Sequence, residues 1–241
     1  MEHSISQTKT SRKPWMDRQK LQVIFDKLIH ALTRPEFHGV ENVPQEGGVI
    51  LATNHMSRMD TLLLFINPAR KDVTALVADK YQKYPLFAWI LRTGGIIWLD
   101  RENADFGALR AAVEVLKKGI ALGIAPEGTR SRTGQLLEGK PGTALVALRA
   151  GVPIVPTAIA GTENVFPRIF TLQRPRISVT FGKPFVLPPL DRDHRDEQMK
   201  RYTDEIMCRI AALLPEKYHG FYRGHPRIRE IQEGIHLDLQ G

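Results

Sequence analysis

Short apolar runs alternate with amphipathic segments along most of this chain. The apolar runs are typical of buried strands and lie at 48–53, 73–77, 95–99, 119–125, 153–160 and 176–181. Segments whose apolar residues recur at helical spacing lie at 58–66, 84–92, 104–118, 141–150 and 193–214. This alternation predicts an α/β fold in which helices flank a largely parallel central sheet. Active sites in such sheets gather at the carboxyl ends of the strands, so the residues that follow each run are the first candidates for chemistry.

A further amphipathic helix is predicted over residues 15–32, before the alternating region begins. Lys20 and Lys27 lie off its apolar stripe, which consists of Leu21, Ile24, Phe25, Leu28, Ile29 and Leu32. Such a helix either packs on its own domain or lies in a membrane interface with its apolar face buried, and the pattern allows both. We expect the chain to divide into a polar start with this helix (1–36), a main domain (37–220) and a C-terminal tail (221–241).

The balance of charges favours anionic partners. Lys and Arg number 34 against 26 Asp and Glu, a formal net charge of +8, which suits lipid headgroups, phosphorylated substrates or nucleic acid. No nucleic-acid recognition module is recognisable. The single Cys208 excludes an intrachain disulfide and suits a reducing compartment.

Nothing in the sequence predicts a membrane span or a secretion signal. No apolar run approaches the roughly 20 residues needed to cross a bilayer. Residues 1–13 are polar and lack the apolar core of a signal peptide. We therefore expect a protein that neither spans a membrane nor leaves the cell by that route.

The first chemical signal is the pair His55 and Asp60, which flank a predicted helix start. Ser57, with an acidic residue three positions on, is typical of a helix N-terminus, so Ser57 is the expected N-cap. The chain turns at a cap, which allows a side chain just before it to meet one in the first turn. A carboxylate on one imidazole nitrogen leaves the other free to act as a base. A solvated loop histidine beside an aspartate that only caps the helix has the same spacing, and the local pattern leaves both interpretations open.

The second signal follows the apolar run 119–125, in the sequence Pro-Glu-Gly-Thr-Arg-Ser-Arg-Thr-Gly that begins at residue 126. Gly128 allows close approach of the backbone to a ligand, Thr129 adds a hydroxyl, and Arg130 is a planar donor suited to phosphate oxygens. Lys140 supplies another cation before the next predicted helix. The segment therefore indicates an anion site, although a basic surface turn would contain the same residues.

Two more cations follow strand candidates. Lys80 lies after the run 73–77 and Arg101 after the run 95–99, where each either reaches the same rim or makes a surface ion pair. The segment Val152–Pro156 carries no ionisable group, so we expect it to be a wall or an edge. No His/Cys cluster has the spacing of a metal site, and we expect no metal.

Together these stretches resemble the glycerolipid acyltransferase family, and within it the 1-acylglycerol-3-phosphate acyltransferases. Four blocks match in order: Asn54-His55-x4-Asp60, Gly95 to Arg101, Pro126 to Ser131, and Val152 to Pro156. The resemblance covers about residues 37 to 185. It implies that His55 is the general base and Asp60 its orienting partner, and that the acceptor's phosphate binds at Glu127, Gly128, Thr129 and Arg130. Arg130 is the expected main contact and Lys80 and Arg101 are candidates, while Lys140 is the further cation that the local pattern adds.

The resemblance also implies a reaction. An acyl chain would pass from acyl-CoA or acyl carrier protein to the sn-2 hydroxyl of lysophosphatidate, on the cytoplasmic face of an anionic membrane, without metal or cofactor. Trp98 and Pro141 depart from the family's pattern near the presumed acceptor pocket. Three rivals stay open: another acceptor such as glycerol 3-phosphate, a lipid-binding protein without turnover, and a thioester hydrolase.

Overall fold

A seven-stranded sheet forms the centre of the computed structural model, which describes residues 17–99, 106–191 and 193–235. The strand order is β1-β7-β6-β2-β5-β3-β4, and every neighbouring pair is parallel except β6 and β7. The strands are β1 Arg34–His38, β2 Val49–Thr53, β3 Thr74–Ala78, β4 Ile97–Leu99, β5 Ala121–Ile124, β6 Ile154–Ala160 and β7 Arg176–Phe181. The predicted fold class is confirmed.

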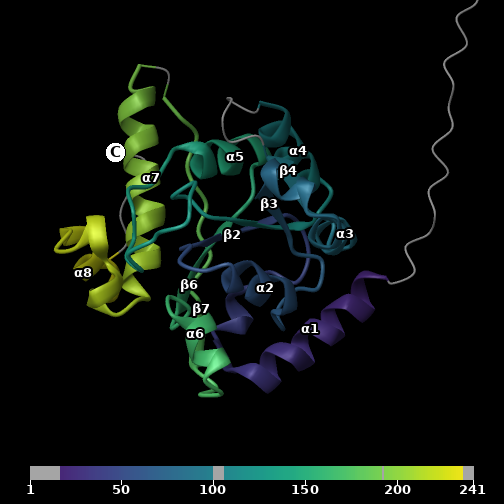
Figure 1. The fold of residues 1–241 in the computed structure, drawn as a ribbon. Helices are drawn as coiled ribbons and strands as arrows, with labels where there is room; N and C mark the ends of the chain where they lie inside the picture. Colours follow the sequence, from purple (N-terminus) through teal and green to yellow (C-terminus); the bar gives the residue numbers. More distant parts are fainter. Residues whose placement is uncertain (1–16, 100–105, 192, 236–241) are drawn as a thin grey trace, which may run out of the picture.

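Helices lie along both faces of this sheet (Figure 1). They are α1 Arg18–Leu32, α2 Met59–Ile66, α3 Pro85–Thr93, α4 Phe106–Lys117, α5 Gly142–Ala150, α6 Val165–Phe170, α7 Arg195–Ala212 and α8 Pro226–Gln232. Short 3₁₀ helices lie at η1 Val40–Asn42, η2 Asp79–Lys83, η3 Glu216–Tyr218 and η4 Gly220–Tyr222. Each helix predicted from periodicity is present within three residues of its expected ends, where those ends fall in the described residues.

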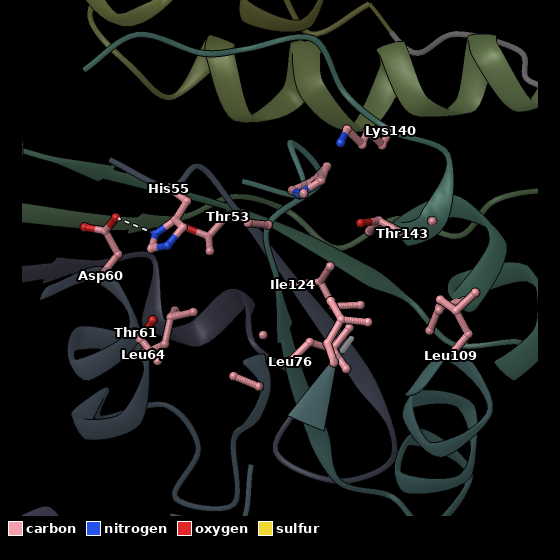
Figure 2. Close-up of a pocket in the computed structure, with 18 residues that line it drawn as sticks. Thr53, His55, Asp60, Thr61, Leu64, Leu76, Leu109, Ile124, Lys140 and Thr143 are labelled. Carbon is pink, nitrogen blue, oxygen red and sulfur yellow. Dashed lines mark hydrogen bonds and ion pairs between the residues drawn. The ribbon is translucent and has the colours of Figure 1, made fainter. Parts of the chain in front are cut away.

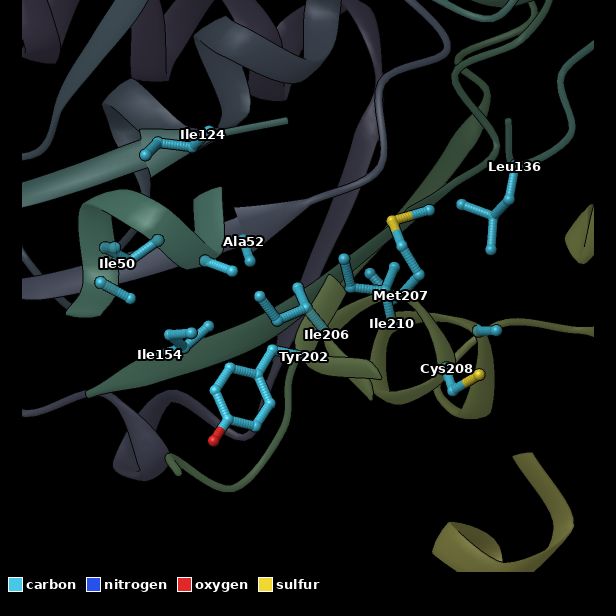
Figure 3. Close-up of a cluster of buried hydrophobic side chains, with 14 of the residues drawn as sticks. Ile50, Ala52, Ile124, Leu136, Ile154, Tyr202, Ile206, Met207, Cys208 and Ile210 are labelled. Atoms are coloured by element: carbon cyan, nitrogen blue, oxygen red, sulfur yellow. The ribbon is translucent and has the colours of Figure 1, made fainter. Parts of the chain in front are cut away.

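Alternate residues of the central strands supply two separate hydrophobic cores. Ile50 and Ile154 point to one face, where they pack with Tyr202 and other residues of α4, α5 and α7 (Figure 3). Leu51 and Val155 point to the other face, where they pack with residues of α1, α2 and α6. Because β2, β5 and β6 are covered on both sides, they appear in the sequence as continuous apolar runs. The interior position of β6 also shows that the segment Val152–Pro156 is not an edge.

The N-terminal helix α1 packs on the domain and still leaves apolar side chains open. Leu21 and Ile29 are buried against the rest of the chain, which the contacts of α1 with α2 and β1 explain. Ile24 and Leu28, from the same predicted stripe, stay 49% and 47% exposed. The apolar stripe of α1 is therefore divided between a face that packs on the domain and a face that is exposed to solvent.

Besides the short 3₁₀ helices, one strand and two α-helices of the described residues were not predicted, and each has a local reason. β1 carries charged and polar side chains in an alternating exposed pattern, because it is the edge strand that pairs with β7. The six-residue helix α6 is too short to show a period. The helix α8 lies in the expected tail, where Ile228 joins the core and Arg227 binds the buried Glu205 of α7. The domain limits at residues 36 and 220 stay predictions.

No helix within the described residues combines the length and the apolar character that a membrane span requires.

Candidate functional site

The site begins where β2 ends, and Asn54 fixes that end. Its side-chain Nδ2 donates to the backbone carbonyl oxygen of Ile159 at 2.8 Å. Its side-chain Oδ1 accepts from the Ile159 N–H, also at 2.8 Å. The side chain thus replaces a backbone pair between β2 and β6, in a buried position where both groups need partners. The next residue, His55, therefore leaves the sheet in a defined direction.

Asp60 is the most densely bonded side chain of the site. It is 1% exposed, and its Oδ2 accepts from the N–H groups of Met56 and Ser57 at 2.7 Å each. The same oxygen lies 3.0 Å from His55 Nδ1. Its Oδ1 accepts from the hydroxyl of Thr162 at 2.6 Å. Four donors therefore hold one carboxylate group, three of them at Oδ2 and one at Oδ1.

This arrangement determines which imidazole nitrogen is free. Since two backbone N–H groups already donate to Asp60 Oδ2, that oxygen acts as an acceptor, and His55 Nδ1 must carry the proton between them. The neutral ring then has its lone pair on Nε2. Figure 2 shows Asp60 on one side of the imidazole and the cavity on the other. The structure thus brings together the two residues that the resemblance pairs and the local pattern left open, and their catalytic role stays a prediction.

The helix that carries Asp60 starts one residue later than predicted. α2 has Arg58 as its N-cap, with no capping bond from the Arg58 side chain, so the assignment of Ser57 as N-cap is wrong. Ser57 lies one position earlier, where its hydroxyl accepts from the Met59 N–H at 3.3 Å and its own N–H points at Asp60. The Asp60 carboxylate thus satisfies the amides of Met56 and Ser57 before the helix, and the Ser57 hydroxyl satisfies that of Met59.

Glu127 connects the segment after β5 to the segment after β2 through hydrogen bonds. Its side chain is 1% exposed, with Oε1 accepting from the His55 N–H and Oε2 from the Leu137 N–H, both at 2.9 Å. The Ser131 N–H in turn donates to the His55 carbonyl oxygen at 2.8 Å. Burial raises the pKa of Glu127 to about 7. Both of its oxygens are occupied within the chain, so the geometry gives Glu127 a part in positioning His55, and its predicted contact with a substrate stays untested.

A cavity of about 220 Å³ opens beside the imidazole. Four of the predicted site residues line it: His55, Asp60, Gly128 and Lys140. Much of the remaining wall is aliphatic, from Leu64, Leu76, Leu99, Leu109, Ile124 and Val146 (Figure 2). A base, a cation and an apolar wall therefore share one space.

Gly128 and Lys140 lie against each other at this cavity. Gly128 has a φ of +66°, and a Cβ there would lie 3.1 Å from Lys140 Cδ. The Lys140 N–H also donates to the Pro126 carbonyl oxygen at 2.8 Å. A side chain at position 128 would therefore be strained and would displace the lysine, which explains the glycine at the turn.

The other predicted contacts lie apart from the cavity lining. Thr129 is exposed and Arg130 half-buried, both on the turn that follows Glu127. Lys80 is exposed on η2, with its ammonium 5.6 Å from the Tyr81 ring centroid. Arg101 lies outside the described residues.

Sequence reasoning missed Thr162, which completes the bonds to Asp60. It lies just after β6, behind Gly161 with its φ of +88°. The only local signal is a glycine and a hydroxyl residue at the carboxyl end of a strand, 102 positions from the aspartate. In the part of the chain that the structure describes, no three His, Cys, Asp or Glu side chains are grouped to hold a metal ion. The expectation of a metal-free site stays a prediction.

Known proteins with similar sequences and folds were found. The sequence model of the family described as Acyltransferase matches residues 34–160. A 1-acyl-sn-glycerol-3-phosphate acyltransferase of Borreliella burgdorferi is 32% identical over 130 residues, which are 53% of this chain and 52% of that protein. A protein of the same name from Cocos nucifera is 31% identical over 173 residues, which are 69% of this chain and 54% of that protein. The matched region thus spans about half the length of these curated relatives.

A solved structure has the same fold. The 1-acyl-sn-glycerophosphate (LPA) acyltransferase PlsC from Thermotoga maritima matches with a TM-score of 0.60 at 24% sequence identity, over 78% of this chain and 79% of that one. This likeness supports the sheet with flanking helices that the sequence predicted.

Replacing Thr162 by Val should destabilise the protein by about 1–3 kcal/mol, because Asp60 Oδ1 would stay buried without a donor. Thr162→Ser should restore most of the loss. Urea denaturation measures the free energy of unfolding, and Thr157→Val is the matched control: Thr157 is equally buried on β6, but its hydroxyl donates only to a backbone carbonyl. Equal stability of Thr162→Val and the wild type would contradict the bond.

Glu127 should make stability depend on pH. Its pKa of about 7 in the folded state lies above the ordinary value of 4.5. The folded chain therefore keeps a proton that the unfolded chain has released at intermediate pH. This contribution to stability is complete below pH 4.5 and is lost as the pH rises to 7. Relative to Glu127→Gln, the wild type should lose about 3 kcal/mol over this window.

Denaturant unfolding at a series of pH values measures this difference, and Glu46→Gln, at an exposed position, is the control that should run parallel to the wild type. A constant difference between the wild type and Glu127→Gln across the window would show that Glu127 is ionised throughout.

Proposed function

The chain belongs to the acyltransferase family, and from this membership we propose that it transfers an acyl chain from a thioester to the sn-2 hydroxyl of lysophosphatidate, giving phosphatidate. The curated relatives that carry this activity in their names support the choice of acceptor. The observation that carries the proposal is the imidazole of His55, whose Nδ1 is bound to Asp60 while its Nε2 faces the cavity.

The proposed reaction needs a base because an alcohol is a weak nucleophile at neutral pH. His55 Nε2 takes the proton of the acceptor hydroxyl as its oxygen attacks the thioester carbonyl carbon. The tetrahedral intermediate then collapses, the carbon–sulfur bond breaks, and the thiolate leaves. The imidazolium returns its proton to that sulfur, so the products are the ester and the free thiol.

Asp60 supports each stage of this cycle. Its bond to Nδ1 keeps the ring in one tautomer and stabilises the imidazolium that forms during attack. Because the carboxylate is itself held by two backbone N–H groups and by Thr162, it does not turn away when the ring becomes charged. The step as written uses the chain's own side chains, and the expected absence of a cofactor stays a prediction.

The cavity lining suits both the acyl chain of the donor and the phosphate of the acceptor. Its aliphatic wall suits an acyl chain, since each buried CH₂ contributes about 0.8 kcal/mol. Lys140 is the cation on the same wall as Gly128, and it suits the acceptor's phosphate. Arg130 lies on the neighbouring turn, outside the cavity lining, and its contact, like those predicted for Lys80 and Arg101, rests on the resemblance alone. The donor is either acyl-CoA or acyl carrier protein.

We also propose that the enzyme works at the surface of an anionic membrane, on its cytoplasmic face. The open side of α1 presents Ile24 and Leu28 with the exposed Lys20 and Lys27. This combination of apolar and basic side chains is typical of helices that lie in a membrane interface. It also explains why only part of the α1 stripe is covered by the domain.

Replacing His55 by Ala should reduce the turnover number by about 10²–10⁴-fold, the usual contribution of a general base. The measurement is the transfer of a labelled acyl chain, from acyl-CoA and from acyl carrier protein, to a panel of lysophosphatidate, glycerol 3-phosphate and other lysolipids. His38→Ala, at an exposed edge position, is the control that should keep full activity.

The same panel separates the proposal from its rivals. Faster acylation of glycerol 3-phosphate than of lysophosphatidate would show that glycerol 3-phosphate is the preferred acceptor. Free fatty acid released without any acceptor would indicate a thioester hydrolase. No turnover with any pair, while lipid binding persists, would indicate a binding protein, and unchanged turnover in His55→Ala would exclude His55 as the base.

A further inference from the structure

A second apolar surface, far from α1 in sequence, lies at the end of α6. We call residues 166–174 the α6 tip. Phe166 is 41% exposed, Phe170 83% and Leu172 85%. The last two values are the highest among the large exposed apolar side chains of the described residues. An apolar group this open has no packing role in the domain, so its presence needs another reason.

The backbone holds Leu172 outward at a conformational cost. The Leu172 N–H donates to the Ile169 carbonyl oxygen at 2.9 Å and the Gln173 N–H to that of Arg168 at 3.0 Å, the pattern of a Schellman helix end. Leu172 occupies the left-handed position of this motif, with a φ of +58°. Glycine usually fills that position because it has no Cβ to clash. The chain therefore keeps a leucine where glycine would be more stable, and that leucine is almost fully exposed.

The segment that carries these apolar side chains is basic. The segment Val165–Arg176 contains Arg168, Arg174 and Arg176 and no Asp or Glu. All three arginines are exposed. Exposed aromatic and aliphatic side chains on a segment with exposed arginines complement a bilayer whose headgroups are anionic.

The α6 tip is joined to α1 and begins four residues after Thr162, whose hydroxyl binds Asp60. The Arg174 side chain donates to the carbonyl oxygen of His30, in α1, at 2.7 Å. Figure 1 shows α6 beside the C-terminal end of α1. Toward the site, Val165 follows three residues after Thr162, whose hydroxyl binds Asp60. A bilayer that contacts the α6 tip would therefore touch a segment that begins shortly after the residue bonded to Asp60.

We propose that the α6 tip inserts Phe170 and Leu172 into the surface of an anionic bilayer, as a second lipid contact beside α1. The inference rests on the proposed function in choosing lipid as the occupant. It deepens that proposal by assigning the contact to a segment that directly follows the Asp60-binding Thr162. The left-handed conformation of Leu172 lowers the stability of the fold while it keeps an apolar side chain protruding from the surface.

The sharpest test is Leu172→Gly, because a structural and a membrane role predict opposite results. Glycine relieves the left-handed conformation, so the melting temperature should hold or rise. Loss of the inserted side chain should weaken partition of the full chain onto phosphatidylcholine vesicles containing phosphatidylglycerol about tenfold. Val186→Ser is the matched control. Val186 is 61% exposed but follows Phe185, which pairs with the opposite end of β6, at Ile154.

A site-specific probe locates the contact. The only cysteine, Cys208, is buried, and burial raises the pKa of its thiol to about 12, so it should not react with a label. Leu172→Cys carrying a polarity-sensitive fluorophore should brighten on anionic vesicles and respond little to pure phosphatidylcholine. The same label at Val186→Cys should not respond.

Two results would overturn the proposal: unchanged vesicle partition of Leu172→Gly, or a silent probe at position 172. If partition is unchanged and the wild type self-associates while Leu172→Gly does not, the α6 tip is an interface between copies. Acyl transfer to a short-chain, water-soluble acceptor should be unchanged in Leu172→Gly. Failure of the membrane contact is thus separate from failure of the catalytic proposal, which would remove turnover from the wild type itself.

Discussion

The structure depends on one buried carboxylate. Asp60 receives hydrogen bonds from the imidazole of His55, from two backbone N–H groups of its own turn and from Thr162 beyond β6. A buried charge is stable only when its lone pairs are satisfied, so the turn after β2, the start of α2 and the end of β6 must meet at this point. The same bonds that stabilise the fold orient the imidazole. Folding and the proposed chemistry therefore rely on a single set of contacts.

Glu127 extends this arrangement to the neighbouring strand. It accepts from the His55 N–H and lies at the end of β5, next to β2 in the sheet. The parallel order brings the carboxyl ends of β2, β5 and β6 together, and each end supplies one part of the site. The cavity opens where these parts meet, with Lys140 and an aliphatic wall around the free imidazole nitrogen. The sheet topology thus explains why residues distant in sequence share one site.

The sequence predicts what depends on local pattern and misses what depends on distance. The buried strands and the long helices follow from periodicity, and the meeting of His55 with Asp60 follows from the helix start that lies between them. Thr162 was not predictable, because its partner lies 102 positions earlier and only the pairing of β6 with β2 brings them together. Lys80 and Lys140 look alike in the sequence, yet only Lys140 lines the cavity, since its N–H is fixed on Pro126.

The measurement that tests the central claim most directly is the tautomer of His55, read by ¹⁵N NMR of the imidazole at pH 8. If Asp60 acts as a fully bonded acceptor, the ring carries its proton on Nδ1 and shows an unprotonated Nε2 in the wild-type protein. A proton on Nε2, or a mixture of both neutral tautomers, would contradict the account, because the nitrogen that faces the cavity would then not be free to accept a proton.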